Sequence, residues 1–278
     1  MPSIRLNNCN IYYETFGAKQ KPVIVLLHAF PLDHNVWKPQ AKALSSEYYI
    51  VTPDFRGHGQ SEATVEAYSM DLLASDVKAL IDSLGLRNIV LGGISMGGYV
   101  AFAYARLFPE DLRALLLVDT KAEADTSQAR MGRMEMADTV RKKGVSAFAD
   151  QMLPRLFSKE SMNLNNSFVQ EARKIIEAMN PVGIVGGLKG LAERADSTPL
   201  LERSRVPTLI IAGEEDQITT PENAKTIMKG IVGSKLVIIP KAGHISTLEQ
   251  PEKVTSAIQT FLKEIPLSKR PVHMTPRS

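Results

Sequence analysis

The sequence predicts an α/β fold: a mostly parallel, twisted sheet with helices on both faces, an antiparallel hairpin at its N-terminal edge and an inserted helical cap. Three observations predict it. Short aliphatic runs alternate with helix-like stretches along most of the 278 residues, as in proteins whose parallel strands are joined by helical crossovers. Around Ser95 a strand-like run changes directly into a helix-like one. Residues 121–203 contain several helix-like segments and no convincing strand.

Composition and charge fit a globular protein. Hydrophobic residues make up 44% and charged residues 23%, and the longest aliphatic runs are far shorter than a membrane-spanning helix. The net charge of +3 comes from scattered residues, so we expect no nucleic-acid or membrane partner. The first residues lack the apolar core of a signal peptide, and the single cysteine, Cys9, cannot form an internal disulfide. We therefore expect a cytoplasmic protein with a structural cysteine.

The first third of the chain predicts an edge hairpin and two further strands. Residues 3–16 alternate polar and apolar side chains around Asn7 and Asn8, which is typical of an antiparallel hairpin. Residues 22–28 read as a buried strand, and a helix is expected from about Trp37 to Leu44. Residues 48–54 form the next predicted strand, which leads into a glycine-containing turn at 54–61.

The remaining elements continue the alternation. Apolar residues recur at helical spacing from Ser69 until Gly85, which is expected to end that helix. A buried strand is then expected over residues 89–91, and the alanine-rich stretch 99–107 before Pro109 reads as a helix. Three more strands are expected at residues 113–119, 207–213 and 235–240.

The strand-to-helix switch carries the first chemical signal. Residues Gly93-Ile94-Ser95-Met96-Gly97 match G-x-S-x-G, in which the two glycines permit a sharp turn that exposes the serine hydroxyl. A serine at a helix N-terminus lies beside free backbone N–H groups and the positive end of the helix dipole, which can stabilise an oxyanion. On its own the motif is also compatible with a tight loop or a phosphate-binding turn.

A serine nucleophile needs a base, and the position of each histidine separates the candidates, which are His28, His34, His58, His244 and His273. His244 directly follows the strand at 235–240, at the carboxyl end where catalytic groups of parallel sheets gather. We expect His28 and His58 to brace turns by hydrogen bonds and His34 to lie in a loop near the mouth of the site. His273 lies in the basic, proline-containing tail at 266–278, to which we assign no function.

The acid that orients the histidine is expected after an earlier strand. Asp216 follows the strand at 207–213 and is the preferred candidate, while Asp119, at the end of the strand 113–119, is an alternative. Glu214 and Glu215 beside Asp216 can be explained as solvated residues. The resulting chain order is Ser95, Asp216, His244, the order described for α/β-hydrolases.

On these residues the chain resembles the α/β-hydrolase superfamily, from about Ile11 to Leu262. His28-Ala29-Phe30-Pro31 and the segments 54–61 and 93–98 are similar to those of small carboxylesterases, enol-lactonases and acyl-homoserine-lactonase-like hydrolases. The resemblance implies that Ser95 is the nucleophile, His244 the base and Asp216 the acid. It also implies that the backbone N–H groups of Phe30 and Met96 form the oxyanion hole, with Ala29 where the family usually has glycine.

The implied activity is hydrolysis of a small-molecule carboxylic ester or lactone through an acyl-enzyme, with no metal or organic cofactor. The expected division is a hydrolase core at 1–120 and 204–265, a cap at 121–203 and a tail at 266–278. Six of the eleven methionines lie in the cap, and we expect them to fill gaps in its own core rather than to line a pocket. Those six are Met131, Met134, Met136, Met152, Met162 and Met179.

Several alternatives stay open on the same residues. Carbon–carbon bond hydrolases and perhydrolases use the same serine triad, and a hydrolase-like protein can also bind a ligand without catalysis. Haloalkane dehalogenases and epoxide hydrolases resemble this fold but have an aspartate at the position of Ser95. A metal-dependent lactonase is disfavoured because Asp33-His34 alone does not provide its ligand cluster.

Overall fold

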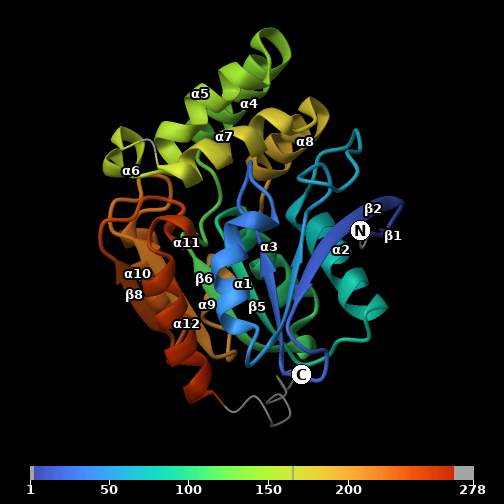
Figure 1. The fold of residues 1–278 in the computed structure, drawn as a ribbon, viewed down its shortest axis with the longest axis vertical. Helices are drawn as coiled ribbons and strands as arrows, with labels where there is room; N and C mark the ends of the chain where they lie inside the picture. Colours follow the sequence, from blue (N-terminus) through green and yellow to red (C-terminus); the bar gives the residue numbers. More distant parts are fainter. Residues whose placement is uncertain (1–2, 165, 266–278) are drawn as a thin grey trace.

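The fold is described by a computed structural model that covers residues 3–164 and 166–265. Its described strands form one eight-stranded sheet in the order β1-β2-β4-β3-β5-β6-β7-β8 (Figure 1). The pairs β1–β2 and β2–β4 are antiparallel, and every later pair is parallel. The strands are β1 (Ser3–Leu6), β2 (Cys9–Phe16), β3 (Val23–Leu27), β4 (Tyr49–Pro53), β5 (Ile89–Ile94), β6 (Leu112–Val118), β7 (Thr208–Gly213) and β8 (Lys235–Ile239). The predicted parallel sheet with an N-terminal hairpin is confirmed.

Helices cover both faces of the sheet. α1 packs beside α12 on one face, and α2 packs beside α3 on the other (Figure 1). Strands β4, β5 and β7 are buried along their whole length, as expected of parallel strands enclosed by two helical layers. The helices of this part are η1 (His34–Trp37), α1 (Lys38–Leu44), α2 (Met70–Ser83), α3 (Met96–Leu107), η2 (Pro109–Asp111), α10 (Pro221–Gly230), α11 (Ser246–Glu249) and α12 (Pro251–Glu264).

The N-terminal hairpin turns at the two asparagines. Asn7 and Asn8 have φ angles of 44° and 61°, and Leu6 pairs with Cys9 across the turn. Positive φ at both central residues is the conformation that a two-residue hairpin turn requires, and asparagine tolerates it better than most residues. Cys9 is buried as expected, and burial raises the pKa of its thiol to about 11, so it stays protonated and fills space in the hairpin.

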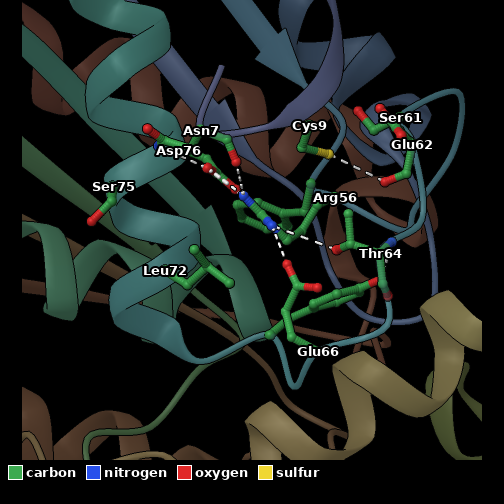
Figure 2. A network of polar contacts seen from close by, with 12 residues as sticks. Asn7, Cys9, Arg56, Ser61, Glu62, Thr64, Glu66, Leu72, Ser75 and Asp76 are labelled. Atoms are coloured by element: carbon green, nitrogen blue, oxygen red, sulfur yellow. Dashed lines mark hydrogen bonds and ion pairs between the residues drawn. The ribbon is translucent and has the colours of Figure 1, made fainter. Parts of the chain in front are cut away.

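An arginine fastens the turn after β4 (Figure 2). The Arg56 guanidinium donates to both carboxylate oxygens of Asp76, over 2.6 and 2.8 Å, and to Glu66 over 2.6 Å. Asn7 donates to the same Asp76 carboxylate, so this one ion pair joins the hairpin, the turn and α2. Burial opposes the charge of Arg56, but the hydrogen bond and charge of Asp76 outweigh it and raise the arginine's pKa. The turn at 54–61 is thereby held rigidly against the main body.

Residues 121–203 form a helical segment that lies over the carboxyl end of the sheet (Figure 1). Its described residues contain no strand, as predicted, and its elements are α4 (Ser127–Lys143), α5 (Val145–Leu156), α6 (Lys159–Asn163), α7 (Ser167–Ala178), α8 (Pro181–Ala192) and α9 (Thr198–Leu201). Its helices contact one another, α4 with α8 and α5 with both α4 and α7. The buried residues of α7 are Val169, Ala172 and Ile176, one face of the helix. The predicted tail at 266–278 lies outside the described residues.

None of the helices within 3–164 and 166–265 combines the length and apolar character needed to cross a membrane.

Candidate active site

Ser95 occupies the turn between β5 and α3. Its φ and ψ are 53° and −114°, a conformation that residues other than glycine adopt only under strain. A Cβ on Gly93 would lie 2.1 Å from the carbonyl oxygen of Gly97, and a Cβ on Gly97 would lie 2.3 Å from that of Leu27. Neither position can therefore carry a side chain without a backbone shift. This is the sharp strand-to-helix turn that G-x-S-x-G predicts.

The carboxyl ends of β5, β7 and β8 bring the three predicted side chains together. Nε2 of His244 lies 2.6 Å from Oγ of Ser95, and its Nδ1 lies 2.8 Å from Oδ2 of Asp216. All three residues are at most 7% exposed. The contact with Asp216 assigns the ring proton to Nδ1, because a carboxylate only accepts, and leaves Nε2 to accept the serine proton.

Asp216 is fixed by the residues that follow it. Oδ1 accepts the backbone N–H groups of Ile218 and Thr219, and Oδ2 accepts the Thr219 hydroxyl over 2.7 Å. Burial raises the pKa of Asp216, but the charge of His244 and these hydrogen bonds lower it below its ordinary value. For His244, burial disfavours the cation, whereas the charge and hydrogen bond of Asp216 raise the pKa above its ordinary value. Thr219 was not predicted, although Asp216-Gln-Ile-Thr219 has the spacing of an aspartate that caps its own turn.

Asp119 is buried beside the triad but contacts other groups. Its Oδ1 accepts the N–H of Gly213 over 2.8 Å, and its Oδ2 accepts the N–H and hydroxyl of Ser246 over 3.0 and 2.6 Å. It makes no hydrogen bond to His244 within the described part of the chain, so the geometry favours Asp216 over Asp119 as the partner of the imidazole. Burial and the nearby charge of Asp216 raise the pKa of Asp119 to about 7.

The backbone of His244 is also held by the helical segment. The N–H groups of His244 and Ile245 donate to the carbonyl oxygen of Leu156 at the end of α5, over 3.0 and 3.2 Å. Glu249 adds a second link, because one of its carboxylate oxygens accepts the N–H of Gly243 and the other accepts the N–H of Ser158. No local pattern of residues predicts either link, since both depend on how the helical segment packs on the sheet.

The two N–H groups expected to form the oxyanion hole come from segments that follow two neighbouring strands, β5 and β3. Met96 follows Ser95 as the first residue of α3, and Phe30 follows the end of β3, which pairs with β5. Among the described residues, neither N–H donates to a protein acceptor, so both are available to a ligand. The backbone carbonyl of Ser95 is held by the Thr120 hydroxyl over 2.9 Å, which limits movement of this turn.

His28 and His58 brace this region as neutral rings. Nδ1 of His28 donates to the carbonyl oxygen of Ala29, and Nε2 accepts the N–H of Phe55 over 2.9 Å. Nδ1 of His58 donates to the carbonyl oxygen of Arg56 over 3.0 Å. Burial lowers the pKa of His28 to about 3 and that of His58 to about 4. Both rings therefore behave as the sequence predicted, as hydrogen-bonding supports of turns.

The prediction that His34 lies in a loop near the mouth of the site was wrong. The ring is 5% exposed, and its Nδ1 lies 2.7 Å from Oδ1 of Asp54, which also accepts the His34 backbone N–H. Burial opposes protonation of His34, but the hydrogen bond and charge of Asp54 raise its pKa. His34 is therefore not a loop residue: it is the first residue of η1 and joins this short helix to the end of β4. Glu214 and Glu215 are exposed, as expected of solvated residues.

A cavity of about 610 Å³ opens over Ser95 and His244. Phe30 and Ile218 line it from the main body, and side chains of α4, α5 and α8 form the opposite wall. Met131, Met136 and Met152 belong to that wall and Met134 is exposed, so the prediction that the methionines fill a core was wrong for these four. Met179 is buried away from the cavity and Met162 packs against the core, as predicted.

The chain matches the family model for the alpha/beta hydrolase fold over residues 22–251. It is 30% identical to 3-oxoadipate enol-lactonase 2 of Acinetobacter baylyi over 257 residues, covering 90% of this chain and 92% of that protein. A thermophilic esterase from Thermogutta terrifontis, solved with malate bound, superposes with a TM-score of 0.90 at 36% identity, covering 95% and 98% of the two chains. The enol-lactonase from Burkholderia xenovorans LB400 superposes with a TM-score of 0.89 at 29% identity, covering 95% and 100%.

Proposed function

Because the chain belongs to the α/β-hydrolase fold family, we propose that it is a serine hydrolase that cleaves small carboxylic esters or lactones through an acyl-enzyme intermediate. The observation that carries the proposal is the continuous hydrogen-bonded series from Asp216 through His244 to Ser95, with contacts of 2.8 and 2.6 Å. The similarity to proteins named enol-lactonase and esterase supports the substrate class. The cytoplasmic location stays a prediction from the sequence.

In the first half of the reaction, Nε2 of His244 removes the proton of Ser95 while Oγ attacks the carbonyl carbon of the ester. The negative charge that develops on the carbonyl oxygen is stabilised by the N–H groups of Phe30 and Met96. Collapse of this intermediate breaks the bond to the alkoxy oxygen, which takes the proton from His244. With an ester the alcohol departs, and with a lactone the new hydroxyl stays attached to the acyl group.

In the second half, His244 removes a proton from water as the water oxygen attacks the acyl-enzyme carbonyl. The resulting intermediate expels Oγ of Ser95, which regains its proton from His244, and the carboxylic acid leaves. In both halves Asp216 holds the imidazole in the required tautomer and stabilises its cation. Its hydrogen bonds to Ile218 and Thr219 keep the carboxylate in place while the charge on the ring changes.

We further propose that the helical segment at 121–203 acts as a cap that selects substrates. Its helices α4, α5 and α8 supply one wall of the cavity, and three methionines contribute to that wall. Methionine side chains are flexible and polarisable, so they can accommodate acyl or alcohol groups of different shape.

The decisive experiment is Ser95→Ala, assayed with p-nitrophenyl butyrate. We expect kcat/KM to fall by at least about 10⁴-fold, because removing the nucleophile of a serine triad leaves only binding and oxyanion stabilisation. Ser46→Ala is the matched control, since Ser46 is exposed and far along the chain from the site. Wild-type turnover by Ser95→Ala with an unchanged melting temperature would refute the mechanism.

The base is tested in parallel. His244→Ala should lose activity as severely as Ser95→Ala, and a fluorophosphonate should label Ser95 in the wild-type protein only. Full activity in His244→Ala together with loss in His58→Ala would assign the base to the other histidine.

A further inference from the structure

Arg155 is a cationic side chain of the cavity without an acidic partner. It lies on α5 and lines the cavity together with Ser95 and His244. Within 3–164 and 166–265, its guanidinium forms no ion pair with any carboxylate, and its hydrogen bond is a 3.9 Å contact with the sulfur of Met136. A thioether is a weak acceptor, so the five N–H donors of this guanidinium are largely unused by the protein.

Arg133, the second arginine that lines the cavity, does have an acidic partner. Arg133 forms an ion pair with Asp125, whose other carboxylate oxygen accepts from Arg194 over 2.6 Å. Asp125 is therefore already shared between two guanidinium groups and cannot neutralise Arg155. Glu135 also lines the cavity, but it lies beyond ion-pair distance of Arg155.

The surroundings of Arg155 favour an incoming anion. Arg155 is exposed to the solvent of the cavity, and partial desolvation together with the positive charge of Arg133 lowers its pKa, so an anion would be a favourable neighbour. The guanidinium fork matches the two oxygens of a carboxylate, and such a pair gains strength where water is partly excluded. A ligand carboxylate would supply the counterion that the described residues do not.

Arg155 is also close to the reacting groups. It immediately precedes Leu156, whose carbonyl oxygen accepts the backbone N–H of His244 over 3.0 Å. Its charge acts on the imidazole, where it opposes protonation. Arg155, Ser95 and His244 line the same cavity of about 610 Å³, so one bound substrate can contact Arg155 while its carbonyl group lies at Ser95.

From these contacts we infer that the ester or lactone cleaved at Ser95 carries a free carboxylate on a short chain, and that Arg155 binds this carboxylate. The inference rests on the proposed function and adds the substrate class to it. Arg155 is thus a specificity-determining residue, while Met131, Met136 and Met152 contact the apolar part of the substrate.

The test uses two matched pairs of p-nitrophenyl esters. One member of each pair is the half-ester of glutaric or adipic acid, and the other carries a terminal amide in place of the carboxylate, which removes the charge at nearly equal size. Each substrate is corrected for its uncatalysed hydrolysis. We expect the wild type to prefer the half-esters.

In Arg155→Gln the ratio of kcat/KM between charged and uncharged members should fall about 10- to 100-fold, the loss of one hydrogen-bonded charge pair. Most of this change should appear in KM. Arg155→Lys keeps the charge without the fork, so its ratio should be intermediate. Arg141→Gln is the control, because Arg141 is exposed at the end of α4 and pairs with Asp138 outside the cavity. Melting temperatures establish that each variant is folded.

A ratio that Arg155→Gln leaves unchanged would overturn the inference while Ser95-dependent hydrolysis of the neutral esters still supports the proposed function. Absence of Ser95-dependent hydrolysis of any ester would overturn both. Binding gives a readout that does not need turnover. Glutarate should bind to Ser95→Ala and at least about 10-fold more weakly to the Ser95→Ala, Arg155→Gln double variant. Equal binding, or none in either protein, would count against the carboxylate site.

Discussion

The two buried carboxylates near His244 are expected to respond differently to the same substitution. Asp216 contacts the imidazole, whereas Asp119 bridges Gly213, at the end of β7, and Ser246, two residues after the histidine. Asp119 therefore fixes the strand end before the acid to the loop that carries the base. We predict that Asp119→Asn mainly weakens stability and that Asp216→Asn mainly abolishes catalysis.

The size of the effect follows from the hydrogen bonds of Asp119. Its carboxylate accepts three, and an asparagine has one acceptor oxygen and one NH₂ donor. In either orientation of the amide, one buried backbone N–H, of Gly213 or of Ser246, faces the NH₂ group and loses its acceptor. Such an unsatisfied group costs about 1–3 kcal/mol. For a protein of this size, that corresponds to a melting temperature lower by about 2–10 °C.

Thermal and urea unfolding at pH 8, with p-nitrophenyl butyrate hydrolysis on the same preparations, measure both effects. At pH 8 the wild-type Asp119 is ionised, since its pKa is about 7. We expect Asp119→Asn to keep kcat/KM within about 10-fold of wild type and Asp216→Asn to lose about 10³- to 10⁴-fold, as when a triad acid is neutralised. An Asp119→Asn protein with unchanged stability and the larger loss of activity would show that Asp119 is the working acid.

Three further predictions concern the base, the nucleophile's turn and the arginine of the β4 turn. The apparent pKa on the acidic side of the plot of kcat/KM against pH should lie above 6.5, because catalysis needs neutral His244. Burial lowers the pKa of His244, but the charge of Asp216 outweighs burial and raises it. An apparent pKa below 6.5 would show that burial dominates. Gly97→Ala should destabilise the fold by at least about 2 kcal/mol, since its Cβ would lie 2.3 Å from the Leu27 carbonyl oxygen, and a normal urea midpoint would refute the crowding. Arg56→Met should lower the free energy of unfolding by about 3–5 kcal/mol in the same assay, because it leaves the buried carboxylate of Asp76 without its ion-pair partner. A decrease of less than about 1 kcal/mol would show that Asp76 finds another partner.

Local patterns were sufficient to predict the sheet and the three residues brought together at its edge. Strands buried on both faces appear in the sequence as aliphatic runs, and a side chain directly after such a strand must lie at the carboxyl edge, where Ser95, Asp216 and His244 meet. His34 was misplaced because its burial depends on a contact with Asp54, which lies 20 residues away at the end of β4. The residues around His34 carry no information about that contact. The cavity methionines were misassigned because helical spacing gives the buried face of a helix but not what lies opposite it.

The helical segment also helps to build the catalytic edge, beyond covering it. The sheet fixes Ser95 through its strained turn and Asp216 through the turn after β7. The His244 loop follows β8 and is held on one side by Asp119 and on the other by the helical segment. Leu156 at the end of α5 accepts the N–H of His244, and Glu249 joins Gly243 to the segment following α5. Movement of α5 would therefore displace the base and Arg155 together. Under the role inferred for Arg155, the helix that binds the substrate's carboxylate is also the helix that holds the backbone of His244, so both contacts depend on how α5 is placed over the sheet.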